Sequence, residues 1–405
     1  MTKIAILAVL SVLPYLTSIH LPFISDDYEQ IARARQYGAP SQWPELLRDP
    51  LYRCRATSLI LTRATEAAVG LHPAAYRATA LVLHFVSVLA VLWLARLAGA
   101  SPNVALFAAA FFAVHEGHQE AVIWYAAIHE LFVFPFAAGV CGSWILWRRS
   151  GRPVWYAASL GCFVAALASK ESAVAVVPLL ALMAWKERRW GALAPFAVLS
   201  VAYFAASWTA AGDHLHFNDG TFSLRSNFVW NWANSVGRLF WIWGVLAAAV
   251  LAATGEWRRH RGLLTAALLW VACSLAPYSF LTYMDRVPSR HTYLASGGLA
   301  LVVGVAFASL AERRKLAASV AMAIVLHNAG YVWWKKQPQY ARRAEPTEQL
   351  IRFAREHKGG FSLDCFPYSD WVALRAVQVG ASLPPSIVRP AGTPAEARFC
   401  YDGKL

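Results

Sequence analysis

Two adjacent carboxylates, Asp26 and Asp27, follow directly on an apolar segment that covers residues 4–21. A carboxylate at the mouth of a membrane-spanning segment can accept the proton of a hydroxyl that acts as a nucleophile. Pro22 turns the backbone just before the pair, so the two side chains cannot share one direction, and we expect one of them to face a site. The alternative is that both cap the helix that follows from Tyr28, because Asp is favoured at helix N-termini.

The densest polar stretch of the chain lies between its third and fourth apolar runs. His118 with Glu130, or His115 with Glu116, would suit a metal ion or would position a hydroxyl, and the spacing alone does not decide. His129 and Glu130 fall inside the apolar run, where ionisable groups either face a cavity or form a buried pair satisfied by neighbouring helices. The candidates for binding a metal ion or a hydroxyl-bearing ligand such as an acceptor are His115, Glu116, His118, Glu120, His129 and Glu130.

Basic residues beside later apolar runs form a second group. A bound phosphate needs donors and positive charge around it, and Arg can hold it with two parallel hydrogen bonds. For Arg290 the alternative is contact with lipid headgroups, because long basic side chains reach toward a membrane surface. The candidates for phosphate binding are Lys170, Arg286, Arg290 and His291.

Composition defines the class of protein that must position these groups. Of the 405 residues, 58% are hydrophobic and only 15% are charged, and the mean hydropathy is +0.41. These values indicate an all-α protein that crosses a membrane many times. The net charge of +14 does not indicate nucleic acid, because the basic residues form short clusters between apolar runs.

A bilayer requires about 20 apolar residues per crossing helix, which predicts about eleven spans. Their approximate limits are 4–22, 74–96, 102–115, 121–147, 154–169, 172–186, 190–211, 236–254, 262–283, 293–311 and 316–334.

Basic clusters in alternate connections predict the orientation, since Lys and Arg mark cytoplasmic connections. This places the N-terminus in the cytoplasm and the candidate residues and the C-terminus outside. The clusters are Arg148/Arg149/Arg152, Lys186/Arg188/Arg189, Arg258/Arg259/Arg261 and Arg313/Arg314/Lys315.

The chain divides into a transmembrane domain, residues 1–335, and a small extracytoplasmic αβ appendage, residues 336–405. The long first outer loop, about 23–73, holds two predicted amphipathic helices, Tyr28–Tyr37 and Thr57–Val69, which either line an entrance for a lipid substrate or pack on the spans.

The appendage can bury little core by itself, so we expect it to dock on the transmembrane domain. Its two cysteines, Cys365 and Cys400, would form a disulfide in an oxidising exterior. The chain carries no Walker loop and no dinucleotide fingerprint, which argues against a nucleotide-driven pump.

The order of these motifs resembles the GT-C superfamily of membrane glycosyltransferases. Over about residues 1–335 the chain is similar to the membrane half of TMTC-type protein O-mannosyltransferases and their bacterial relatives. The motifs are Asp26-Asp27, Pro50-Leu-Tyr-Arg53, His115-Glu-Gly-His-Gln-Glu-Ala-Val-Ile-Trp124, Ser169-Lys170-Glu171-Ser and Ser289-Arg290-His291-Thr-Tyr293-Leu.

The resemblance implies an enzyme that moves a sugar from a polyprenyl-phosphate carrier to an acceptor outside the cytoplasm, with inversion. It implies a base at Asp26 or Asp27, and contacts to the carrier phosphate from the four basic candidates. Some members of the superfamily use a divalent metal such as Mg²⁺ or Mn²⁺, which stays open here.

The chain also departs from the pattern of these relatives. It lacks their tetratricopeptide repeats, its acidic pair is Asp-Asp rather than Asp-Glu, and Glu116 replaces a Pro. The acceptor is therefore a protein, a lipid or a glycan.

Two other classes of function compete with this interpretation. A secondary transporter or flippase of a lipid-linked glycan would place polar groups at mid-membrane and repeat its halves. A non-catalytic scaffold for envelope assembly would tolerate Asn in place of the acidic pair.

Overall fold

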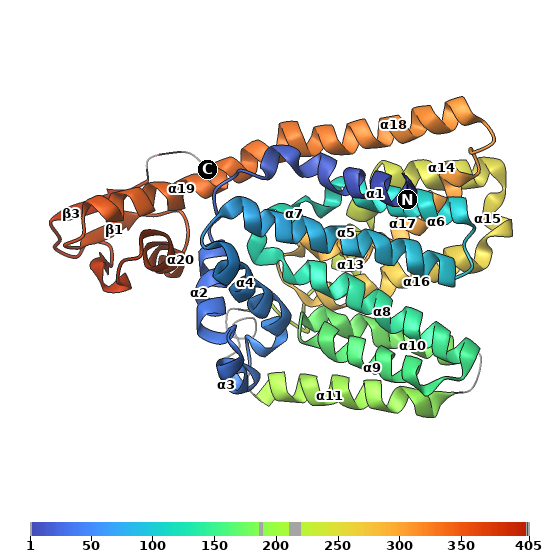
Figure 1. The fold of residues 1–405 in the computed structure, drawn as a ribbon, viewed down its shortest axis with the longest axis horizontal. Coiled ribbons are helices and arrows are strands. Elements are labelled where there is room, and N and C mark those ends of the chain that lie inside the picture. Colours follow the sequence, from blue (N-terminus) through green and yellow to red (C-terminus); the bar gives the residue numbers. More distant parts are fainter. Residues whose placement is uncertain (1, 186–188, 210–219, 402, 404–405) are drawn as a thin grey trace.

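Long helices that run side by side make up most of the protein, and a small lobe stands at one end of them (Figure 1). The computed structural model describes residues 2–185, 189–209, 220–401 and 403. The helices of the bundle are α1 (Thr2–Val12), α5 (Pro73–Leu97), α6 (Pro102–Val114), α7 (Gln119–Ile123), α8 (His129–Ser150), α9 (Pro153–Leu167), α10 (Val176–Trp185), α11 (Ala194–Thr209), α13 (Phe228–Phe240), α14 (Trp243–Thr254), α15 (Glu256–Arg259), α16 (Arg261–Leu275), α17 (Ser296–Ala308) and α18 (Arg314–Gly330).

Several of these helical segments can cross a membrane, which confirms a multi-pass membrane protein. Among the described residues, five segments are long and apolar enough, and the bent pair α13 and α14, with an angle of 76° between its halves, makes a sixth. The five are Pro73–Leu97, Tyr125–Ser150, Trp190–Trp208, Arg261–Phe280 and Arg314–Glu356. Shorter apolar helices occupy the other predicted runs, so the number of crossings stays a prediction.

The turn between α8 and α9 shows how the sequence ends one helix and starts the next. Gly151 closes α8 in the left-handed conformation, with φ of 68°, and its N–H donates to the carbonyl of Trp147. Glycine adopts this conformation without a steric cost. Pro153 then opens α9, where its fixed φ suits the first helical position. The result is a tight antiparallel hairpin.

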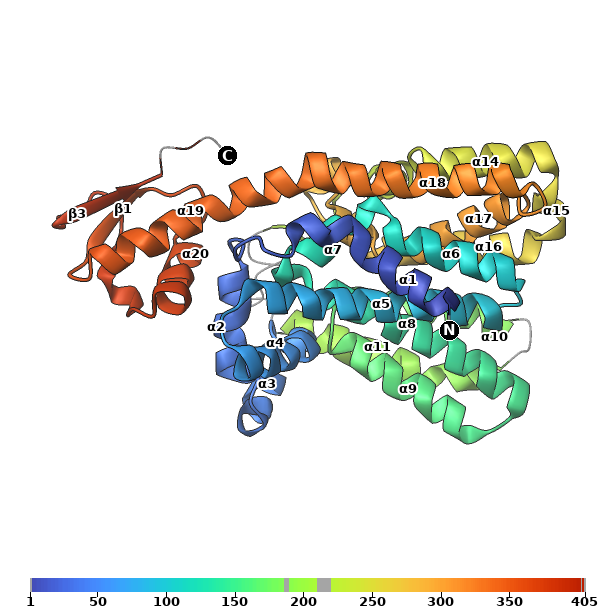
Figure 2. The same ribbon diagram turned by 45° about the horizontal axis from the view of Figure 1, so that its top comes forward.

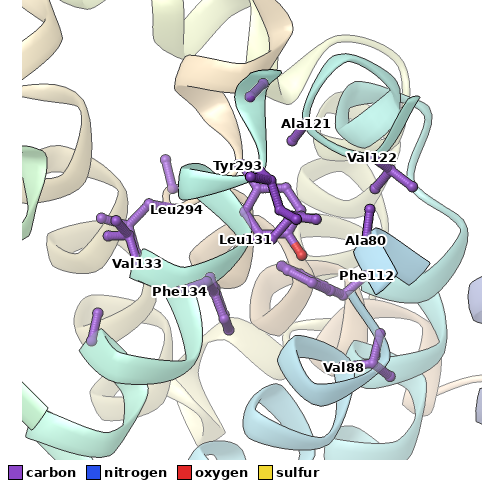
Figure 3. Close-up of a cluster of buried hydrophobic side chains, with 14 of the residues drawn as sticks. Ala80, Val88, Phe112, Ala121, Val122, Leu131, Val133, Phe134, Tyr293 and Leu294 are labelled. Carbon is purple, nitrogen blue, oxygen red and sulfur yellow. The ribbon is translucent and has the colours of Figure 1, made fainter. Parts of the chain in front are cut away.

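The centre of the bundle is α17, which packs closely on its neighbours. A Cβ atom on Gly304 would lie 2.7 Å from the carbonyl oxygen of Val104 in α6, and one on Gly298 would lie 2.3 Å from that of Ala267 in α16. Small residues thus let the helix backbones approach, as in other membrane bundles. Beside α17, Phe112, Phe134 and Tyr293 fill the core between α5, α6 and α8 (Figure 3).

The first outer loop folds into three helices, α2 (Asp27–Tyr37), α3 (Trp43–Arg48) and α4 (Ala56–Val69). The two predicted amphipathic helices are confirmed as α2 and α4. Their apolar faces pack within the protein, since Ile31 and Leu59 are fully buried.

The C-terminal part begins as an extension of the bundle. Helix α18 continues through a π-helical turn into α19 (Gln337–Glu356), so that Arg314–Glu356 forms one helical segment across the expected boundary at residue 335. Beyond it lie α20 (Asp370–Arg375) and a parallel sheet of order β2-β1-β3, formed by Val388–Arg389, Phe361–Cys365 and Ala397–Cys400. The register pairs Phe361 with both Val388 and Ala397.

The C-terminal lobe docks on the first outer loop and is closed by a disulfide. Cys365 of β1 and Cys400 of β3 are bonded to each other. Arg375 forms an ion pair of 2.9 Å with Glu29 of α2, and the Tyr28 hydroxyl donates to Glu348 of α19 at 2.9 Å. The lobe therefore rests on the helix that carries the acidic pair.

The two ends of the bundle differ in character. Helices α2, α3 and α4 and the C-terminal lobe lie at one end, and α15 lies at the other (Figures 1 and 2). The basic connections α8–α9 and α17–α18 lie at the α15 end as well. Lys186 and Arg188 are outside the described residues.

Candidate active site

A cavity of about 1040 Å³ lies at the end of the bundle beside α2. The side chains that line it include five of the predicted site residues, Asp26, His129, Lys170, Arg290 and His291. A second cavity, of about 730 Å³, is lined almost entirely by apolar residues of α5, α8, α10, α16 and α17 and by none of the predicted ones. The chemistry predicted from sequence therefore converges on the first cavity.

Asp26 faces this cavity with a carboxylate that has no hydrogen-bond or ion-pair partner among the described residues. Burial raises the pKa of Asp26, while the positive charges of Arg343 and Arg290 oppose that rise. An unpaired carboxylate with a raised pKa is suited to take a proton from a bound hydroxyl.

Asp27 does not line the cavity, and Ser25 just before the pair has a left-handed backbone with φ of 41°. One oxygen of Asp27 accepts from the N–H of Ile24 at 2.8 Å, and the other accepts from the N–H of Ala126 at 2.7 Å. The side chain is fully buried, which raises its pKa to about 7. Asp27 thus holds the turn rather than capping α2.

Lys170 and Glu130 form a buried ion pair at the wall of the cavity. Glu130 is the second residue of α8, and Lys170 lies just before the 3₁₀ turn η6 (Glu171–Ala175). The second Glu130 oxygen accepts from the Tyr278 hydroxyl at 3.0 Å, and Lys170 Nζ lies 4.9 Å from the centre of the Tyr278 ring. An ammonium has three donors, so the ion pair leaves Lys170 further donors for a ligand.

His291 completes this part of the wall. Its ring stacks on Tyr278 with 4.5 Å between centroids, and its Nδ1 lies 3.5 Å from the Glu130 carboxylate. Burial lowers the pKa of His291 to about 3, so the ring is a neutral hydrogen-bonding group. Its contact with the carrier phosphate stays a prediction.

Arg290 is fixed from behind by Glu120, which does not itself line the cavity. Burial alone would raise the pKa of Glu120, but Arg290 outweighs it and holds that pKa below its usual value. The guanidinium lies 5.1 Å from the centre of the Trp124 ring, another residue of the cavity wall. Arg290 is thus aimed at the cavity by one carboxylate and one aromatic face.

Several predicted candidates are not brought to the cavity. His118 packs in the core, 4.4 Å from Phe112 between ring centroids, and its Nε2 is 2.7 Å from Ser296 Oγ. His115 is stacked on Phe111. The N–H of Glu116 donates to the Asn328 side chain of α18, while Arg286 is exposed.

Other cavity residues escaped the prediction. Arg55 reaches from the first outer loop and forms two hydrogen bonds with Glu171. Tyr278 lies within the predicted span 262–283 and belonged to no motif. Glu29 lines the cavity and binds Arg33 and Arg375. Its i,i+4 spacing to Arg33 was the one available signal.

The described residues do not assemble a metal-binding group. No three His, Cys, Asp or Glu side chains among them converge, and both oxygens of Asp27 are occupied by backbone donors. The expectation of Mg²⁺ or Mn²⁺ stays a prediction, and no step below uses a metal.

One part of the cavity wall is apolar and comes from apolar helices of the bundle. It includes Pro178 of α10, Phe204 of α11, Trp232 of α13, and Ala272 and Cys273 of α16. Such a surface suits a hydrocarbon chain.

The chain shares its fold with solved GT-C glycosyltransferases, in agreement with the resemblance of its sequence motifs. ArnT from Cupriavidus metallidurans, solved bound to undecaprenyl phosphate, matches with a TM-score of 0.58 at 12% identity, over 96% of this chain and 89% of that one. The oligosaccharyltransferase of Archaeoglobus fulgidus in its apo form matches with a TM-score of 0.56 at 11% identity, over 95% of this chain and 64% of that one.

Sequence comparisons add nothing to this likeness. No protein-family model matches the chain, and no curated protein sequence matches it. At 11–12% identity the solved structures show a shared fold, and function must be argued from the site.

Proposed function

We propose that the protein transfers a sugar from a polyprenyl-phosphate carrier to an acceptor hydroxyl. The observation that carries this proposal is that the unpaired Asp26 carboxylate and the cations Lys170 and Arg290 line one cavity, part of whose wall is apolar. A base and cationic donors in one cavity are what transfer from a lipid phosphate requires.

Asp26 acts as the base in this reaction. It removes the proton of the acceptor hydroxyl as that oxygen attacks the anomeric carbon of the sugar. The new carbon–oxygen bond forms on the face opposite the phosphate, so the configuration at the anomeric carbon inverts. Asp27 takes no part in the step, because both of its oxygens are bound to the backbone.

The bond from the anomeric carbon to the phosphate oxygen breaks in the same step, and its electrons leave with the polyprenyl phosphate. Lys170 and Arg290 stabilise the departing anion, and neutral His291 donates or accepts a hydrogen bond beside them. Glu130 and Glu120 position these groups through the ion pairs described above. They are positioning residues.

The carrier chain occupies the apolar wall formed by α10, α11, α13 and α16. A solved structure with this fold contains undecaprenyl phosphate, which supports a lipid carrier of this kind here. The proposed location is a bacterial-type inner membrane, with the N-terminus in the cytoplasm and the cavity and C-terminal lobe outside. The basic connections at the α15 end support this orientation.

A transporter or flippase is the second candidate. The polar side chains of the cavity come from the loops and helix ends at the α2 end, with Glu130 and Tyr278 at the ends of their helical segments. This placement favours chemistry at the membrane surface over passage through its centre.

The test uses purified protein with a panel of polyprenyl-phosphate sugars and a mixture of candidate acceptors. Sugar-dependent release of polyprenyl phosphate, with the sugar recovered on an acceptor in inverted configuration, would support transfer. Movement of an intact lipid-linked sugar across proteoliposomes without release would support the flippase.

A further inference from the structure

Arg343 of α19 is a cation that packs on the cavity residue Trp124 and that the proposed reaction does not use. Its guanidinium lies 4.7 Å from the centre of the Trp124 ring and 5.6 Å from that of Tyr340. Trp124 lines the cavity together with Asp26. Arg343 is thus held at the edge of the site on two aromatic faces, a recurring mode of binding for guanidinium groups.

Among the residues that the structure describes, the charge of Arg343 is not neutralised by an ion pair, whereas the charge of Arg290 is. Arg290 also lies over Trp124, but it is paired with Glu120. Within the described ranges, no carboxylate pairs with Arg343. Its positive charge is the largest of those that oppose the raised pKa of Asp26, so the two groups share one electrostatic environment.

The C-terminal part of the chain holds Arg343 in this place. The Tyr368 hydroxyl donates to the Arg343 carbonyl at 2.7 Å, and the Tyr340 hydroxyl, one turn earlier on α19, donates to Gln119. The Glu348 contact with Tyr28, one turn later, fixes the same helix to α2. Arg343 is therefore held on a supported helix beside the base.

We propose that Arg343 binds an anionic group, a phosphate or a carboxylate, on the acceptor, next to the hydroxyl that Asp26 deprotonates. This inference rests on the proposed function and deepens it by giving the acceptor a chemical class. The guanidinium fork suits either group, because it matches two oxygens at once. Lys170 and Arg290 hold the carrier phosphate, so Arg343 serves the acceptor alone.

The experiment measures transfer to three matched acceptor sugars, one neutral, one phosphorylated and one carrying a carboxylate. The variants are Arg343→Gln, which removes the charge, and Arg343→Lys, which keeps the charge and loses the fork. Arg342→Gln is the control, since Arg342 is the exposed neighbour on the same helix. Near-unchanged melting temperatures establish that each variant is folded.

We expect the parent and Arg342→Gln to prefer an anionic acceptor. In Arg343→Gln, kcat/KM for that acceptor should fall roughly 10- to 100-fold, mainly through KM, while the neutral acceptor changes little. Arg343→Lys should lie between the two. Which anionic acceptor is preferred tells phosphate from carboxylate.

Two results would overturn the inference while leaving the transferase intact. The first is no preference for anionic acceptors in the parent. The second is an equal loss for neutral and anionic acceptors in Arg343→Gln, with a shifted pH profile, which would make Arg343 only a counter-ion of Asp26. Failure of the parent to release polyprenyl phosphate with any acceptor would reject the proposed function, and this inference with it.

Discussion

The guanidinium of Arg55 donates to both oxygens of the Glu171 carboxylate, with nitrogen–oxygen distances of 2.9 and 3.1 Å. The two residues are 116 positions apart in the chain. Their pair ties the first outer loop, which carries Asp26, to the turn that begins directly after Lys170. The pair thus fixes the segment of the proposed base, Asp26, relative to that of a proposed phosphate ligand, Lys170.

Breaking this pair should impair transfer without unfolding the bundle. We expect Glu171→Gln to lower kcat/KM roughly 10-fold, because two-pronged charge-assisted bonds fix geometry as well as adding energy. The double variant Arg55→Glu with Glu171→Arg should recover part of the loss. Glu256→Gln, which breaks the pair with His260 at the other end of the bundle, is the matched control. Equal activity of Glu171→Gln and the parent would refute the role.

Variants of the Lys170–Glu130 pair can distinguish a role in stability from a role in binding the carrier. Lys170→Met should destabilise the protein by about 3–5 kcal/mol, because it leaves a buried carboxylate unpaired. The double variant Lys170→Met with Glu130→Gln should regain most of that stability but no transfer. Thermal unfolding and KM for the polyprenyl-phosphate sugar measure the two effects. Transfer that returns together with stability would show that Lys170 is only structural.

The raised pKa of Asp27 should make the stability of the protein depend on pH. The folded pKa of Asp27, about 7, lies above the pKa of about 4 that an Asp side chain has in an unfolded chain. A raised carboxyl pKa stabilises the folded state fully below the unfolded pKa, and this contribution is lost as the pH rises toward 7. The melting temperature of the parent should therefore fall from pH 4 to pH 7 relative to Asp27→Asn, which does not titrate.

The same variant should be less stable than the parent at low pH. An Asn offers a single oxygen, so one of the two backbone N–H groups loses its partner, at about 1–3 kcal/mol. Parallel melting curves for parent and variant across this pH range would contradict the assignment.

The disulfide should stabilise the C-terminal lobe alone. It closes a separation of 35 residues, for which a loss of about 2–4 kcal/mol is expected on removal. In Cys365→Ser with Cys400→Ser, proteolysis should cut within residues 357–401 while the helices of the bundle stay intact. The variant Cys141→Ser, at a buried free cysteine, controls for the substitution itself. Unchanged proteolysis of the double variant would exclude this role.

Sequence alone predicted the elements whose pattern is local. The amphipathic periodicity located α2 and α4. Hydropathy located the bundle helices, because a helix in contact with lipid needs a continuous run of apolar residues. The basic clusters in alternate connections also predicted that Asp26, Lys170 and Arg290 lie at the same end of the molecule.

The partners of these residues were not predictable in the same way. Glu120 and Glu130 looked like site ligands, but each is the counter-ion of a cation far along the chain. In the sequence, His118 cannot be told from a histidine that binds a ligand. In the structure it packs against the aromatic rings of Phe112 and Tyr293.

Asp26 and Asp27 differ in their surroundings: Asp27 accepts hydrogen bonds from the N–H groups of Ile24 and Ala126, while Asp26 lines the cavity. The residue types of the pair do not predict this difference.

The most direct test of the central claim compares Asp26→Asn and Asp27→Asn in release of polyprenyl phosphate from a polyprenyl-phosphate sugar, with melting temperature as the control for folding. If Asp26 is the base, Asp26→Asn should lose roughly 10²- to 10⁴-fold in kcat with little change in melting temperature. Asp27→Asn should keep most of its kcat per folded molecule. Full activity of folded Asp26→Asn would contradict the account.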